Sequence, residues 1–182
     1  MSAQDEVVFP VVGISGGSSI YDTVPALPRA SQGWFVTNCV FDCTAFALSG
    51  DLVIHPFWPH PSTIPDGAWP TTDADRLVVT TGPTIDVAAV TAHVTNPSGY
   101  YLTTDTAAHV VLLDSTGVPV YAFRATLPSS VAPGSSADLT LAPTGSSGFR
   151  WTPEQTALVA TIEITLDPHL CASDAATDGC LI

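Results

Sequence analysis

The sequence predicts an all-β protein, built as an antiparallel β-sandwich with an extended N-terminal arm and one short helical turn. Three observations lead to this prediction. The 182 residues include 16 prolines and 13 glycines, which interrupt the chain too often for long helices. Short runs rich in β-branched and aromatic residues recur between these breaks. After Asp73 the runs follow one another at the spacing typical of a sandwich.

Six strands are predicted in this regular part of the chain. They are expected at residues 77–81, 85–95, 109–114, 118–126, 137–142 and 158–166. In the last run Ala160, Ile162 and Ile164 alternate with polar residues, so the apolar side chains share one face. The side chains expected to be largely buried are Val90, Val111, Leu113, Leu139, Leu141, Ile162 and Ile164.

One helical turn is predicted between the fifth and sixth strands. Thr152 can cap the helix, Pro153 suits the first helical position, and Gln155 stands where a capping box needs it. Little other helix is expected.

The chain divides into four segments by composition. Residues 1–32 read as a strand at 7–14 followed by a Gly-, Ser- and Pro-rich arm, and residues 33–72 as a hairpin unit with strands at 34–41 and 52–55 before a proline-rich loop. Residues 73–170 form the predicted sandwich. Residues 171–182 form a cysteine-containing tail.

Three turns between the predicted strands carry a family resemblance. They are Val94-Thr95-Asn96-Pro97-Ser98-Gly99, Val111-Leu112-Leu113-Asp114-Ser115-Thr116-Gly117, and residues 127–134 ahead of 137–141. In their order, residues 84–166 resemble the immunoglobulin-like sandwich domains of the FxLYD and late-embryogenesis-abundant-like kind, although the FxLYD signature itself has no literal match. The resemblance implies an immunoglobulin-like fold and implies no catalytic residue.

Composition narrows the possible partners. The chain has no lysine, four arginines and 17 acidic residues, and its net charge of -13 would repel a phosphate backbone. No run approaches the roughly 18 apolar residues of a membrane span, and the acidic start at residues 1–6 does not suit an export signal. We therefore expect no nucleic-acid partner, no membrane, and a cytoplasmic origin.

Low charge also points to assembly. Charged residues make up 12% of the chain, against about 25% in an average soluble domain. With a mean hydropathy of +0.33, a monomer would expose sizeable apolar surface, which usually marks an interface.

The proline-rich loop at residues 56–70 is the first candidate site. Phe57, Trp58, His60 and Trp69 gather there and could contact a ligand or a partner protein. The other interpretation is a stiff loop that covers a sheet edge.

The four cysteines fall in two close pairs, Cys39 with Cys43 and Cys171 with Cys180. Two local disulfides, reduced buried thiols, and a metal site completed by His55, His60 or His169 all remain open. The spacings of three and eight intervening residues are not those of short zinc knuckles.

Enzymatic motifs are weak. Gly13-Ile14-Ser15-Gly16-Gly17 matches a nucleophile elbow, with Asp167 and His169 as nominal partners, but no amphipathic helix follows the serine. Asp66, Asp73 and Asp75 lack the glycine and bidentate glutamate of a calcium loop. We expect no catalytic residue, no cofactor and no bound metal.

The sequence thus favours a non-enzymatic structural protein that forms homo-oligomers or binds other assembly subunits. Its lysine-free, Thr-, Ala- and Pro-rich composition resembles that of virion proteins from phages with GC-rich genomes, which implies a capsid decoration, minor capsid or tail protein located in the virion. The alternative is an immunoglobulin-like module that binds a ligand or peptide through the proline-rich loop.

Overall fold

The computed structural model describes residues 11–12, 35–36, 64–65, 67–81, 86–144, 152–174 and 179–181. Within them the protein is mostly β with antiparallel sheets, as the sequence predicts, and one short helix. The strands are β1 (Val11–Val12), β2 (Phe35–Val36), β3 (Thr71–Thr81), β4 (Asp86–Asn96), β5 (Tyr101–Leu102), β6 (Ala107–Leu113), β7 (Pro119–Thr126), β8 (Ser135–Leu141), β9 (Thr161–Asp167), β10 (Leu170–Cys171) and β11 (Cys180–Leu181).

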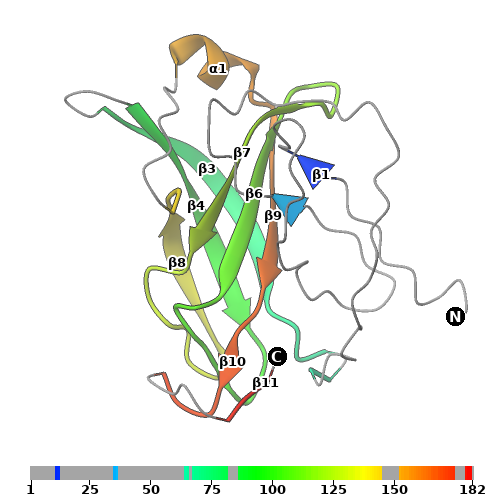
Figure 1. Cartoon of the computed structure of the whole chain (residues 1–182), viewed down its shortest axis with the longest axis vertical. Coiled ribbons are helices and arrows are strands. Elements are labelled where there is room, and N and C mark those ends of the chain that lie inside the picture. The colour runs from blue at the N-terminus through cyan, green and yellow to red at the C-terminus, as the bar shows by residue number, and fades with distance from the viewer. Residues whose placement is uncertain are drawn as a thin grey trace, which may run out of the picture.

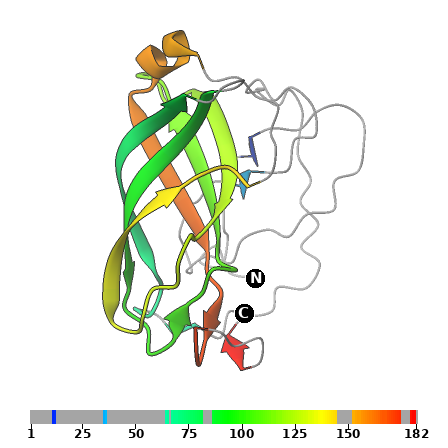
Figure 2. The same ribbon diagram turned by 90° about the vertical axis from the view of Figure 1, so that its left-hand side faces the viewer.

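Two three-stranded antiparallel sheets form the body of the molecule, in the orders β3-β4-β8 and β7-β6-β9. Figures 1 and 2 show their strands running lengthwise, with the helix at one end and β10 and β11 at the other. β3 lies beside β9, where Thr72 Oγ1 donates to the Ile164 carbonyl at 3.3 Å. On the other side, Thr144 donates its backbone N–H to the Arg124 carbonyl of β7 at 2.8 Å. Hydrogen bonds therefore join β3 to β9 on one side and the segment after β8 to β7 on the other.

One hydrophobic core lies between these sheets. It takes alternate residues of β4, β6, β7, β8 and β9, as the two-residue period of a strand requires, and from β3 the partly buried Ala74 and Leu77 on either side of a bulge. Its fully buried members include Val90, Val94, Val110, Leu112 and Leu141. Ile162 and Ile164 are half-buried and pack against this core.

The central strand β6 is buried on both faces. Val111 and Leu113 point away from the main core and form a second small cluster with Ala122 of β7. β2, which pairs in parallel with β1, contacts β6 and β7. The five other residues predicted to be buried (Val90, Val111, Leu113, Leu139 and Leu141) are buried, but two of them belong to this second face.

The helix α1 (Pro153–Leu158) begins at the predicted capping box. The Gln155 backbone N–H donates to Thr152 Oγ1 at 3.3 Å, and the Thr152 backbone N–H donates to Gln155 Oε1 at 2.8 Å. The helix includes Leu158, which the sequence had placed at the start of the last strand, and β9 begins only at Thr161. The pKa of the Glu154 carboxyl is lowered by its own backbone N–H and by the Thr152 hydroxyl.

The turn between β6 and β7 is organised by Asp114. Its Oδ1 accepts from Thr116 Oγ1 at 2.7 Å, from the Thr116 backbone N–H at 2.8 Å and from the Val118 backbone N–H at 3.0 Å. Gly117 closes the turn at a φ of 81°, in the left-handed region that suits glycine. These bonds, the Thr116 hydroxyl first, hold the pKa of the Asp114 carboxyl below its usual value of 3.8.

Replacing Asp114 with alanine is expected to lower the melting temperature by about 2–4 °C, the shift that a modest loss of unfolding free energy causes in a domain of this size. Because the folded-state pKa is depressed, the carboxylate stabilises the fold above pH 3.8 and loses this effect as the pH falls through the folded-state pKa. Thermal unfolding followed by circular dichroism at pH 7 and near pH 3 measures the change in melting temperature and its dependence on pH. A difference between wild type and Asp114→Ala that is equal at the two pH values would contradict the role of the charge.

Candidate functional site

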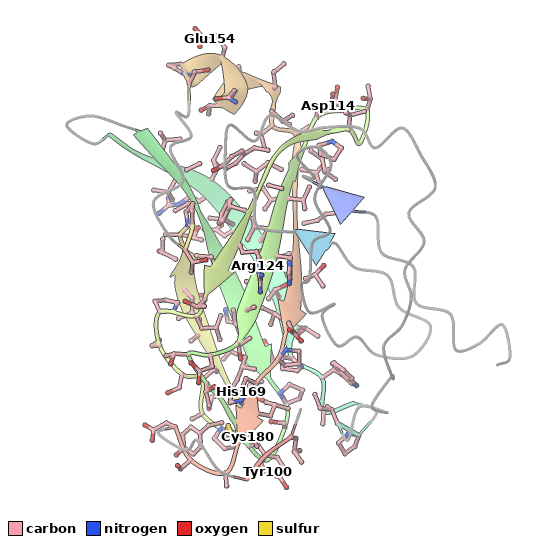
Figure 3. The ribbon with its side chains drawn as sticks, viewed as in Figure 1. Tyr100, Asp114, Arg124, Glu154, His169 and Cys180 are labelled. Carbon is pink, nitrogen blue, oxygen red and sulfur yellow. A yellow bond between two sulfur atoms is a disulfide. The ribbon has the colours of Figure 1, made fainter. Side chains whose placement is uncertain are left out.

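The third sheet, in the order β11-β10-β5, brings two cysteines together beside a histidine. In its register Cys171 stands between Tyr101 of β5 and Cys180 of β11. His169 directly precedes β10. Figure 3 shows His169 and Cys180 at the same end of the molecule, far from Asp114 and Glu154.

The backbone of His169 is held on both sides. Its carbonyl accepts from the Thr103 backbone N–H at 3.0 Å and from Thr103 Oγ1 at 3.2 Å. Its N–H donates to Thr106 Oγ1 at 3.0 Å. Thr103 and Thr106 are themselves buried, so the backbone that carries the imidazole is fixed in position.

The imidazole lies against the sulfur atoms. His169 Nδ1 is 2.9 Å from Thr103 Oγ1 and 3.4 Å from Cys171 Sγ. Cys171 and Cys180 form a disulfide; Cys171 is fully buried, whereas Cys180 and His169 are half-buried. Of the three open interpretations of the cysteines, the structure thus places this pair in the disulfide state. Cys39 and Cys43 lie outside the described residues.

These three residues are also the one set in the described part of the chain whose spacing suits a metal. His169, Cys171 and Cys180 each offer one ligand atom, and the three atoms lie within 4.8 Å of one another. Asp73 and Asp75, weighed as calcium ligands, are exposed on β3. Asp75 instead accepts from Thr91 Oγ1 at 3.0 Å and lies 3.9 Å from Arg76 Nε.

The aromatic loop site is described only in part. Phe57, Trp58 and His60 lie outside the described residues, as do Ser15, His55 and Asp66. Trp69 is half-buried and packs against the main core, so part of its ring is committed to the fold.

A second surface stands out on the outer face of the β3-β4-β8 sheet. Two cross-strand pairs, Thr95 with Ser136 and His93 with Asp138, are hydrogen-bonded at 3.0 Å and 2.7 Å. Thr91 and Thr140 face each other one step further along. His93, Asp138, Ser136 and Thr140 are exposed, so this face is open to solvent.

Sequence reasoning named Cys171, Cys180 and His169 among the possible ligands of a metal site but missed the contact of His169 with Thr103. The three strands of this sheet have two residues each, too short to leave a periodic signal. The polar face of β4 and β8 could have been found from the alternation of polar residues at 91, 93 and 95 and at 136, 138 and 140.

Comparison of the chain with protein-family models, with curated proteins and with solved structures found no match. Among the described residues, no helix has the length and apolar character needed to cross a membrane.

Proposed function

We propose that this protein is a non-enzymatic structural subunit that acts through protein–protein surfaces. Its fold is interpreted as an immunoglobulin-like sandwich, and the assembly as a phage virion in which it serves as a decoration, minor capsid or tail protein. The observation that carries the proposal is the exposed outer face of the β3-β4-β8 sheet.

The β4 and β8 part of this face is made of side chains that lose little freedom on binding, whereas β3 adds the exposed Asp73, Asp75 and Arg76. On β4 and β8 it presents Thr91, His93, Thr95, Ser136, Asp138 and Thr140. Ordering a buried lysine, arginine or glutamate costs about 1.5–2 kcal/mol of side-chain entropy, and interfaces are depleted in lysine and glutamate. The short side chains of β4 and β8, two of whose three cross-strand rows are already hydrogen-bonded, avoid most of that cost.

Several other polar groups among the described residues support the same proposal. Asp114 closes a turn, Thr152 and Gln155 cap a helix, and Thr103 and Thr106 fix a loop. Each of these groups stabilises the fold, which suits a protein that works through its shape.

Replacing Thr140 with glutamate is expected to weaken self-association at least tenfold, the equivalent of about 1.4 kcal/mol. The change sets a long charged side chain close to Asp138, on a face where a neighbouring subunit would bury it. Sedimentation velocity over a range of protein concentrations measures the association constant.

Ala157→Glu is the matched control. Ala157 is exposed on α1, and its substitution makes the same change in net charge away from the sheet. If both variants weaken association equally, general repulsion in this acidic protein explains the effect and the sheet face is not the interface.

A further inference from the structure

We propose that His169, Cys171 and Cys180 form a thiol-gated binding site for a borderline-soft divalent metal ion of the zinc type. In the oxidised protein the two sulfurs are joined in the disulfide described above. In the reduced protein the two thiolates and the imidazole would bind the ion. This inference is independent of the proposed structural function.

The ligand set matches the chemistry of such an ion. Two thiolates and an imidazole are the donors that Zn²⁺ takes in tetrahedral sites. The three donor atoms already lie within 4.8 Å of one another. They come from β10, from β11 and from the residue before β10, and the strand pairing fixes Cys171 opposite Cys180.

The distances between the donor atoms are close to those of a tetrahedral metal site. With bonds of about 2.0 Å to nitrogen and about 2.3 Å to sulfur, a tetrahedral ion holds these donors about 3.5 Å apart. His169 Nδ1 and Cys171 Sγ stand at 3.4 Å. Once the disulfide is broken, the two sulfurs need only separate to about 3.8 Å, and the half-buried Cys180 on the short strand β11 can move to allow this.

The surroundings prepare the imidazole for this role. Both backbone groups of His169 are hydrogen-bonded to Thr103 and Thr106, so the ring would lose little freedom on binding. Metal binding through Nδ1 would replace the bond between Nδ1 and Thr103 Oγ1. The Thr103 hydroxyl would keep donating to the His169 carbonyl, and the ring proton would reside on Nε2.

The chemistry balances with a thiol as the reductant. Two external thiols reduce the disulfide to two cysteine thiols and leave as one external disulfide. Binding of the ion then displaces one proton from each cysteine thiol, and His169 binds through its neutral form. The fourth position of the tetrahedron is left to water.

The test uses Co²⁺, whose thiolate complexes absorb in the near ultraviolet and visible. The full chain carrying Cys39→Ser and Cys43→Ser is reduced with a phosphine and titrated anaerobically. The expected result is sulfur-to-cobalt charge-transfer absorption that saturates at one ion per chain and is displaced by Zn²⁺. The same protein left oxidised should show no such absorption.

Two variants in that background decide the ligands. Adding Cys171→Ser and Cys180→Ser should abolish the absorption. His169→Ala should weaken Co²⁺ binding at least tenfold, because losing a group that only orients a metal ligand already costs about that much, and His169 is proposed as a ligand itself. Reduced protein that stays folded by circular dichroism but shows no cobalt absorption would overturn the proposal. So would absorption that survives loss of both cysteines, or affinity that is unchanged in His169→Ala. Reduced protein that unfolds and does not refold on addition of Co²⁺ would overturn it as well.

Discussion

Replacing Asn96 with aspartate is expected to destabilise the protein by at least about 3 kcal/mol, because the buried carboxylate oxygen in the place of Nδ2 would face only hydrogen-bond acceptors. Asn96 is fully buried at the end of β4. Its Nδ2 donates to the carbonyls of Tyr100 at 2.8 Å, Val131 at 2.9 Å and Ala132 at 3.2 Å. Its Oδ1 accepts from the backbone N–H and the hydroxyl of Ser98. One side chain thus joins the loop after β4 to the loop before β8.

Aspartate has nearly the same shape as asparagine, with an oxygen in place of the amide nitrogen. The substitution therefore changes only the hydrogen-bond donors and the charge. Burial among carbonyls would raise the folded-state pKa of the new carboxyl, so the loss should be smallest below its ordinary pKa of about 3.9 and grow as the pH rises above it. Urea denaturation at pH 7 and at low pH measures this trend. Asn96→Ala is the control: it removes the bonds without a charge, and its effect should depend less on pH. If Asn96→Asp is as stable as wild type at pH 7, the bonds from Asn96 Nδ2 to the three carbonyls do not stabilise the fold as proposed.

The second large effect is expected from Leu112→Ala, which should cost about 2–5 kcal/mol. Leu112 is fully buried in β6, the central strand of its sheet, and belongs to the core shared by both large sheets. Truncation leaves a cavity that residues on two sheets would have to fill together. The free energy of unfolding in urea measures the loss.

Leu158→Ala is the matched control for this prediction. Leu158 is 57% exposed at the end of α1, and alanine is at least as good a helix former there. Its effect should stay within about 0.5 kcal/mol. Similar losses for both leucines would mean that the core between the sheets is not the main source of stability.

Much of the fold follows from local rules that the sequence displays. The long strands β4, β6, β7, β8 and β9 lie close to the predicted runs because turn residues bound them on both sides. The Asp114 turn and the Thr152 capping box were predicted because each consists of a few neighbouring residues whose bonds are local.

The parts of the fold that the sequence did not predict depend on contacts between residues far apart in the chain. β3 begins at Thr71, six residues before the predicted run, because the polar stretch from Thr71 to Arg76 gains its strand conformation from pairing with β4. The sheet of β5, β10 and β11 arises only when the ends of the two large sheets come together. For the same reason the contact between His169 and Thr103, 66 residues apart, could not be read from the sequence.

Sedimentation velocity of the wild-type chain over a series of concentrations shows whether the protein associates with itself. Short polar side chains on the open β4 and β8 part of the sheet face predict oligomers whose fraction rises with concentration. The Thr140→Glu variant run alongside should remain a monomer over the range in which wild type associates. A wild-type chain that sediments as a single folded monomer at every concentration would contradict the proposal that this protein is a self-assembling structural subunit.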